Sequence, residues 1–190
     1  MNVRAPRLAT AGLLTLLTAP VQADDLCDFG APHPEAPPET TQFDFLIGEF
    51  TVSLHSWQGD RWSPPRPAGA RWNGRYGLNG MAIYDEWFDP GPEDVDGTWG
   101  VNVRTYDPQA RLWKVMWISL PARQVQDMRA QLRDGIFTLW QVHPERPDWR
   151  AEFEVQDEDH WARVSYVRDG PNGEWSRQFR LAATRIPCGG

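Results

Sequence analysis

The chain has 190 residues, of which 41% are hydrophobic and 24% charged, and its 26 acidic and 19 basic residues give a net charge of −7. This composition is too apolar for a disordered chain and too polar for a bundle of membrane helices, so it predicts a single globular domain. Phosphate contacts supply most of the affinity for nucleic acids, so an acidic chain without a basic run is expected to have no nucleic-acid partner.

Residues 1–23 have the pattern of a secretion signal. Arg4 and Arg7 precede a short apolar run from 8 to 17, and residues 21–23 form a small-residue cleavage pattern. A membrane-spanning helix needs about 20 apolar residues, so the run favours a signal peptide over an anchor. We therefore predict cleavage after Ala23, a mature chain without an integral membrane segment, and a periplasmic or secreted location.

Two cysteines, Cys27 and Cys188, lie near opposite ends of the mature chain. In an oxidising compartment this arrangement predicts one disulfide, with two free thiols or a metal site as the alternatives. Two cysteines without a nearby histidine make a poor zinc ligand set. Closing a loop of about 160 residues would contribute on the order of 4–5 kcal/mol through loop entropy.

Residues 24–41 are rich in proline and predict an extended arm ahead of the domain, which we place at 42–190. A short helical turn is expected over Gln42–Ile47. From there the pattern changes to alternating apolar and polar residues, as in Phe50, Val52 and Leu54, which is typical of strands. We expect nine or ten strands, near residues 50–57, 71–77, 80–88, 97–106, 111–119, 124–133, 136–142, 149–156, 160–168 and 174–184.

Short strands joined in sequence by tight turns favour one topology. Turn signals such as Asp134-Gly135 fall between most of the strands. They predict an all-β fold, an antiparallel up-and-down β-barrel of about 8–10 strands with a short N-terminal helical turn. Closure of the sheet would remove its exposed edges, and a sandwich is the alternative.

Eleven tryptophans are unusual for a chain of this length, and most of them fall within the expected strands. Such large rings can fill a small barrel, or they can line a cavity and stack on a flat ligand. We take Trp87, Trp99, Trp113 and Trp117 as the candidate aromatic wall of such a cavity.

Three charged residues share the apolar face of their strands. Asp85 lies on the same face of its expected strand as Ile83 and Trp87. Arg163 and Arg177 likewise share a face with apolar residues of their own strands. A charge inside a barrel is costly unless it is paired, so Asp85 is expected to pair with Arg163 or Arg177. The group is either a structural ion pair or a floor that binds an acidic ligand through an arginine fork.

A series of short motifs runs in order through residues 41–186. They are FDFLIGEF at 43–50, GMAIYDEWF at 80–88, Tyr106-Asp107-Pro108 with Trp113 and Trp117, Asp134-Gly135, and the last strand from Trp175 to Arg185. Together they resemble the bacterial family called domain of unknown function 1579. The resemblance implies a calycin-type barrel related to lipocalins, whose bottom is closed by the 43–50 segment. It supplies no catalytic residues.

The sequence lacks the usual motifs of nucleophilic, phosphate-binding and zinc enzymes. Related barrels can hold haem through a histidine near the C-terminal strands, and no histidine follows Trp161, so we expect no cofactor. We therefore favour a non-catalytic barrel that binds a small apolar or aromatic, and in one version acidic, molecule. The alternatives are a lipocalin-like isomerase or lyase with Asp85 or Glu86 as acid or base, and a structural or envelope-stress protein with a filled core. No oligomeric state is predicted.

Overall fold

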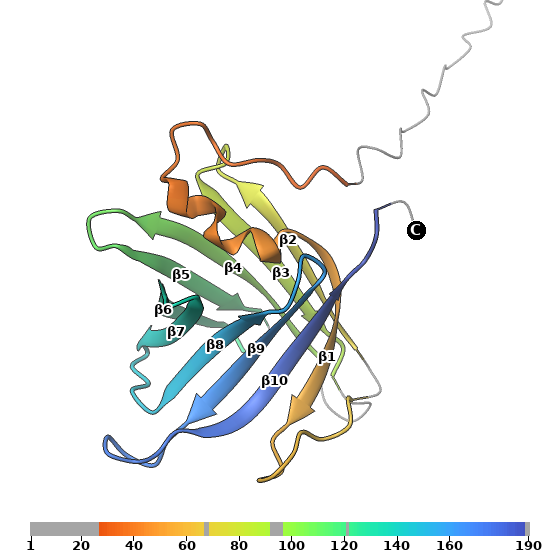
Figure 1. Cartoon of the computed structure of the whole chain (residues 1–190), viewed down its shortest axis with the longest axis vertical. Helices are drawn as coiled ribbons and strands as arrows, with labels where there is room; N and C mark the ends of the chain where they lie inside the picture. Colours follow the sequence, from red (N-terminus) through yellow and green to blue (C-terminus); the bar gives the residue numbers. More distant parts are fainter. Residues whose placement is uncertain (1–26, 67–68, 92–96, 121, 189–190) are drawn as a thin grey trace, which may run out of the picture.

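The computed structural model of the protein describes residues 27–66, 69–91, 97–120 and 122–188 (Figure 1). Within these residues ten antiparallel strands form a closed barrel in sequence order, with β1 paired to both β2 and β10. The predicted all-β up-and-down barrel is therefore confirmed, while the predicted signal peptide lies outside the described residues. The strands are β1 (Gly48–Ser56), β2 (Ala70–Gly77), β3 (Ala82–Asp89), β4 (Thr98–Asp107), β5 (Leu112–Ser119), β6 (Gln124–Arg133), β7 (Ile136–His143), β8 (Trp149–Val155), β9 (His160–Val167) and β10 (Ser176–Arg185).

The alternating pattern places one set of side chains of each strand inside the barrel. In β1 the side chains of Phe50, Val52 and Leu54 are buried, whereas Thr51 between them is exposed. Because side chains of a strand point alternately to its two faces, a period of two in the sequence becomes one apolar inner surface. The same rule holds along most of the barrel, but β4 buries the polar residues Asn102 and Arg104, and the register of β10 shifts between Arg177 and Phe179.

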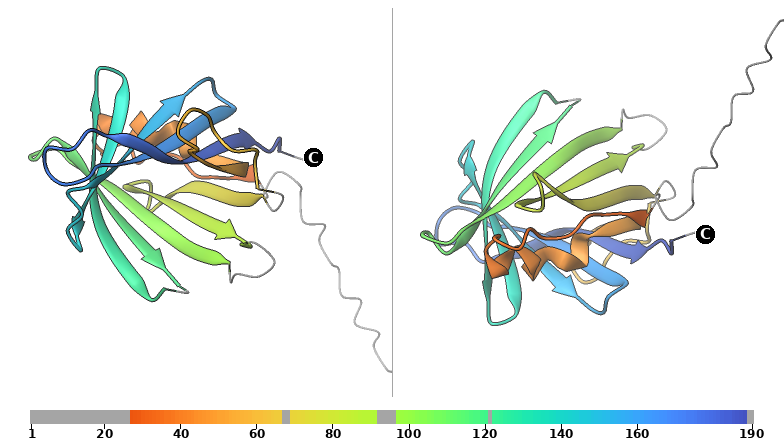
Figure 2. Two further views of the ribbon diagram at one scale, coloured as in Figure 1. Left: turned by 90° about the horizontal axis from the view of Figure 1, so that it is seen from below. Right: turned by 90° about the horizontal axis from the view of Figure 1, so that it is seen from above.

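A 3₁₀ helix, η2 (Pro38–Leu46), closes one end of the barrel, which we call the helix end. It is orange in Figure 2, where the view from above shows it in front of the strands. Phe43 and Leu46 are completely buried, and the Phe43 ring stacks on Phe137 at a centroid distance of 4.1 Å. Helical structure begins four residues before the turn predicted at Gln42, because the backbone of Thr40 already bonds to Pro37.

Strand β2 is shaped to receive the end of η2. Any side chain at Gly74 would collide with the carbonyl oxygen of Leu46. The indole Nε1 of Trp72, two residues earlier, donates a hydrogen bond to the same oxygen at 3.3 Å. A glycine and a tryptophan on one face of β2 thus allow the helix to lie directly against the sheet.

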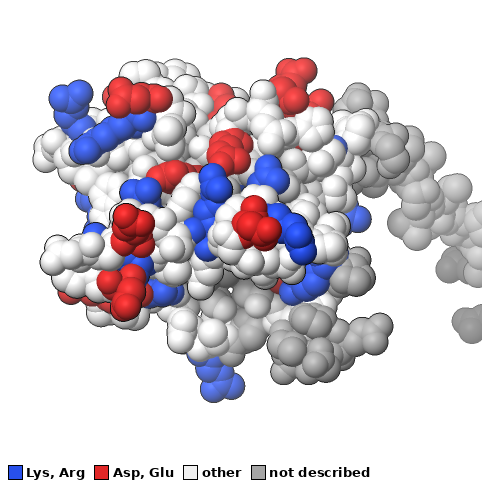
Figure 3. Space-filling model, turned by 60° about the horizontal axis from the view of Figure 1, so that its bottom comes forward, with Lys and Arg blue, Asp and Glu red and all other residues white. Residues whose placement is uncertain are grey.

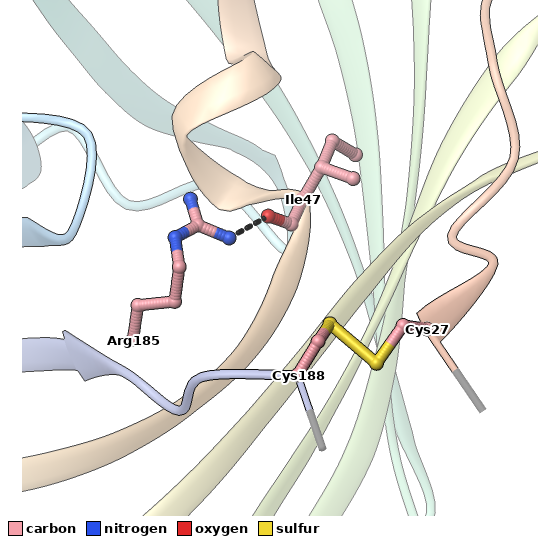
Figure 4. Close-up of a disulfide and its surroundings, with 4 residues drawn as sticks. All are labelled: Cys27, Ile47, Arg185 and Cys188. Carbon is pink, nitrogen blue, oxygen red and sulfur yellow. Dashed lines mark hydrogen bonds between the residues drawn. A yellow bond between two sulfur atoms is a disulfide. The ribbon is translucent and has the colours of Figure 1, made fainter. Parts of the chain in front are cut away.

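The first and last described residues, Cys27 and Cys188, are joined at the helix end (Figure 4). Cys27 and Cys188 form the predicted disulfide, with Cα atoms 5.8 Å apart and a sequence separation of 161. Nearby, Arg185 donates from Nη1 to the carbonyl oxygen of Ile47 at 2.6 Å and from Nη2 to that of Glu158 at 2.7 Å. The last strand is therefore tied to the segment that closes the barrel.

The opposite end, which we call the loop end, holds the connections that follow β1, β3, β5, β7 and β9 (Figure 1). Three of them are long, residues 57–69, 90–97 and 168–175, whereas residues 134–135 suffice for a turn at the helix end. Within the part of the chain that the structure describes, no helix is both long and apolar enough for a bilayer crossing.

Candidate functional site

A cavity of about 240 Å³ lies inside the barrel toward the loop end, and we call it the lumen cavity. Aromatic rings from five different strands form its side wall. Polar groups from β4, β6 and β9 complete the lining, among them Asn102, Gln126 and Arg163. The aromatic members of the lining are Trp72, Trp87, Trp117, Trp149 and Phe179.

Two of the four tryptophans predicted to form an aromatic wall line this cavity. Trp87 on β3 and Trp117 on β5 face inward and are partly buried. Trp72, which sequence reasoning did not select, faces Trp87 across the β2–β3 pair, and their ring centroids are 6.3 Å apart. Its position directly opposite Trp87 on the neighbouring strand could have identified it, because paired residues of adjacent antiparallel strands lie on the same face of the sheet.

The other two predicted wall residues lie elsewhere. Trp113 is 1% exposed and packs edge-on against Phe43 at 4.8 Å, so it belongs to the core of the helix end. Trp99 is 53% exposed on the outside of the barrel, where its ring meets Phe88 at 5.0 Å. The prediction for Trp99 was wrong because β4 turns its polar face, not its apolar face, toward the interior.

The inward face of β4 carries the partner of Asp85. Asp85 is fully buried, and its carboxylate forms an ion pair with Arg104, which is 2% exposed. Asn102 Nδ2 donates to Asp85 Oδ1 at 2.6 Å. Asp85 was predicted to pair with Arg163 or Arg177, and this was wrong. Asn102 lies directly opposite Asp85 in the pairing of β3 with β4. Arg104 is the next inward-facing residue of β4, and its side chain can therefore reach Asp85.

Arg104 connects this ion pair to the core beneath it. Its guanidinium lies over the rings of Phe43 and Trp72, at 5.4 and 5.5 Å from their centroids. Burial, and then the positive charge of Arg163, lower the pKa of Arg104 to about 9. The pair therefore forms a polar layer between the closed core and the lumen cavity.

A second ion pair borders the cavity near the loop end. Arg66 Nη2 donates to Asp89 Oδ1 at 2.6 Å, and the same oxygen accepts from the backbone nitrogen of Gly91 at 2.9 Å. Asp89 lines the cavity and is 8% exposed. Both of the buried carboxylates in this region thus have an arginine partner.

Arg163 on β9 lines the cavity as well, and its surroundings differ. Among the residues that the structure describes, no carboxylate lies within 4.0 Å of its guanidinium and no hydrogen bond to its side chain is formed. Its Nε is buried without a partner there. Burial lowers the pKa of Arg163 to about 10, so the side chain still carries its charge at neutral pH.

Arg177 was predicted to point inward and does not. The pairing of β10 with β9 shifts between Arg177 and Phe179, which marks a β-bulge at Gln178. A bulge adds one residue to the alternation, so two residues of equal parity face opposite sides. Phe179 therefore lines the cavity, while Arg177 is exposed and lies over the ring of Trp57 at 5.1 Å.

No group of three or more His, Cys, Asp or Glu side chains capable of holding a metal occurs within the described ranges. The charged and amide groups that line the lumen cavity are instead Asn102 and Gln126, Asp89 with its partner Arg66, and Arg163. Such a site can orient a ligand by hydrogen bonding and charge, with aromatic faces available for stacking.

Comparisons with known proteins address the fold. No protein-family model matches the chain, and no curated protein matches it. A solved structure, the S-type phycobiliprotein lyase CPES from Guillardia theta, is similar over 77% of this chain and 91% of that chain, with 13% identity and a TM-score of 0.50. At this identity the likeness concerns the fold alone, which is the closed antiparallel β-barrel described above.

Proposed function

We propose that this protein binds a small, flat apolar or aromatic molecule in its lumen and does so without catalysis. The observation that carries the proposal is the lumen cavity, about 240 Å³ in volume and bounded by four tryptophans and a phenylalanine. Drug-sized ligands usually occupy pockets of about 300–1,000 Å³. A ligand of one or two fused rings suits this smaller space.

The choice of binding over catalysis rests on the carboxylates. Asp85, one candidate acid or base, is fully buried in its pair with Arg104 and does not line the cavity. Glu86, the other candidate, points outward and bonds to Arg75 at 3.1 Å. The similar solved structure is described as a lyase, which keeps a lyase or isomerase as the alternative activity. Among the described residues, Asp89 is the carboxylate that lines the cavity, and it is already paired with Arg66.

The proposal includes a location and a family. The pattern of residues 1–23 and the disulfide support export to a periplasmic or extracellular space, where disulfides persist. The ordered motifs and the barrel support membership of the family called domain of unknown function 1579. Mass analysis of the exported protein tests the location, and we expect a chain that begins at Asp24 and carries one disulfide.

Binding is tested by calorimetric titration with 2-naphthamide, a neutral two-ring probe. We expect saturable binding with one site per chain. Trp117→Ala removes a ring from the lumen wall and should weaken binding roughly tenfold, since one aromatic contact contributes on the order of 1 kcal/mol. Trp99→Ala removes a ring from the outside of the neighbouring strand and is the matched control, with no expected effect. Equal losses in both variants, or no saturable binding, would contradict the proposal.

A further inference from the structure

One charged side chain at the lumen cavity has no ion-pair partner among the described residues. Asp85 is bound to Arg104, and Asp89 is bound to Arg66 at 2.6 Å. Arg163 is the third arginine of this region, and within the described residues there is no third carboxylate to neutralise it. The described lining and its ion-pair partners therefore carry a net positive charge inside an aromatic space.

Arginines elsewhere in the barrel show how this fold satisfies a structural guanidinium. Arg185 donates to the carbonyl oxygens of Ile47 and Glu158 and pairs with Asp159. Arg168 donates to two carbonyl oxygens, those of Pro147 and Pro171. On the outside, Figure 3 shows basic and acidic side chains intermingled. Arg163 has none of these arrangements within the described chain, which argues against a purely structural role.

An unpaired charge away from bulk water costs free energy, and here a neighbouring arginine adds repulsion. Burial, and after it the charge of Arg163, lower the pKa of Arg104. A ligand that brings a negative charge would remove both costs. A guanidinium is well suited to this task because its N–H groups can bind a carboxylate or sulfonate as a fork.

The position of Arg163 along β9 shows how deep in the lumen cavity its charge lies. Arg163 comes two residues after Trp161, which is 1% exposed in the core of the helix end, and it is paired across the sheet with Phe153 and Leu181. Further along β9, Val167 is paired with Trp149, which lines the cavity near the loop end. Arg163 thus lies at the floor of the cavity, with aromatic rings between it and the loops.

We propose that Arg163 is the receptor for the anionic head of the lumen ligand, which enters head first and keeps its flat body among the tryptophans. The ligand class is then a monoanionic aromatic acid, a carboxylate or sulfonate on one or two fused rings. The inference rests on the proposed function, because it names the chemistry of the same cavity.

The test compares 2-naphthoate with 2-naphthamide, which share a ring system and differ in charge. Wild-type protein should bind the acid about 10- to 100-fold more tightly, the range expected for a charge-assisted hydrogen bond of about 1.5–3 kcal/mol. Arg163→Met should abolish this preference and leave the affinity for the amide within about twofold. Arg163→Lys keeps the charge and should retain part of the preference. Arg177→Met removes an exterior arginine and should leave both affinities unchanged.

The outcomes separate the two proposals. Equal binding of acid and amide by the wild type, or an undiminished preference in Arg163→Met, would overturn the role of Arg163 while lumen binding stands. Binding of neither compound would overturn the proposed function and this inference with it. If Arg163→Met fails to fold, Arg163→Lys decides, because a rigid fork is expected to bind the acid more tightly than an ammonium.

Discussion

The two ends of the barrel use the same residue types for opposite purposes. At the helix end, Phe43 stacks on Phe137 and packs against Trp113, and all three are at most 4% exposed. At the loop end, Trp87 and Trp117 are only partly buried and border a cavity of about 240 Å³. Aromatic rings therefore close one end of the fold and line a space at the other.

The polar groups differ in the same way. The layer formed by Asp85, Asn102 and Arg104 is fully buried and internally bonded. Arg163, above it, has no ion-pair partner among the described residues. Packed and satisfied groups contribute stability, whereas an incompletely satisfied site is typical of regions kept for binding. We accordingly expect substitutions at the helix end to affect stability and those at the loop end to affect binding.

The largest loss of stability is expected from removing the disulfide. Replacing both Cys27 and Cys188 with serine opens a loop closed over 161 residues. Loop entropy then gives a loss of about 5 kcal/mol, which is an upper value. Urea unfolding of the double variant measures it, and a loss below 1 kcal/mol would show that the disulfide does not secure the helix end.

The next largest effect is expected at Phe43. Its ring is completely buried between Phe137, Trp113 and the guanidinium of Arg104. Phe43→Ala should lower the free energy of unfolding by about 4 kcal/mol through lost contacts and a new cavity. Affinity for 2-naphthamide should change little as long as the protein is folded, and a selective loss of binding would place the site at the wrong end.

Arg104→Met is expected to cost about 3 kcal/mol, because it leaves the fully buried Asp85 without its counter-ion. Adding Asp85→Leu to this variant should recover most of the loss, since two apolar side chains can replace a buried ion pair. Urea unfolding of the single and double variants gives the coupling between the two sites. Additive losses would mean that the two charges do not interact.

A smaller effect on stability is expected from Trp117→Ala, about 1 kcal/mol, because a ring that faces a cavity makes fewer contacts than one in a packed core. The same variant should show the roughly tenfold loss of affinity described above. A stability loss as large as that of Phe43→Ala would remove the distinction between the two ends.

Much of the fold was predictable from the sequence, because the evidence for it is local. The period of two in residues such as Phe50, Val52 and Leu54 gave strands whose bounds agree with the structure within about two residues at most positions. The predicted pairing of Cys27 with Cys188 is also confirmed. These features depend on alternation, turns and cysteine number, which a single sequence displays.

The site was less predictable, because it depends on which face of each strand turns inward. The alternation of residues along each strand correctly placed Trp87, Trp117 and Arg163 in the lumen. It failed for Trp99, since β4 buries Asn102 and Arg104 to satisfy Asp85. It failed for Arg177 because a bulge reverses the alternation. Neither a compensating charge on another strand nor a bulge leaves a local signal in the alternation pattern.

The stability of Arg163→Met with and without 2-naphthoate tests most directly whether Arg163 is kept for binding an anionic ligand. Without ligand the variant should be more stable than the wild type by about 1 kcal/mol, because it loses a charge that no described carboxylate neutralises. With saturating naphthoate the order should reverse, since the wild type gains more from binding. If Arg163→Met is less stable than the wild type by the same amount in both conditions, Arg163 is a structural residue and the account is wrong.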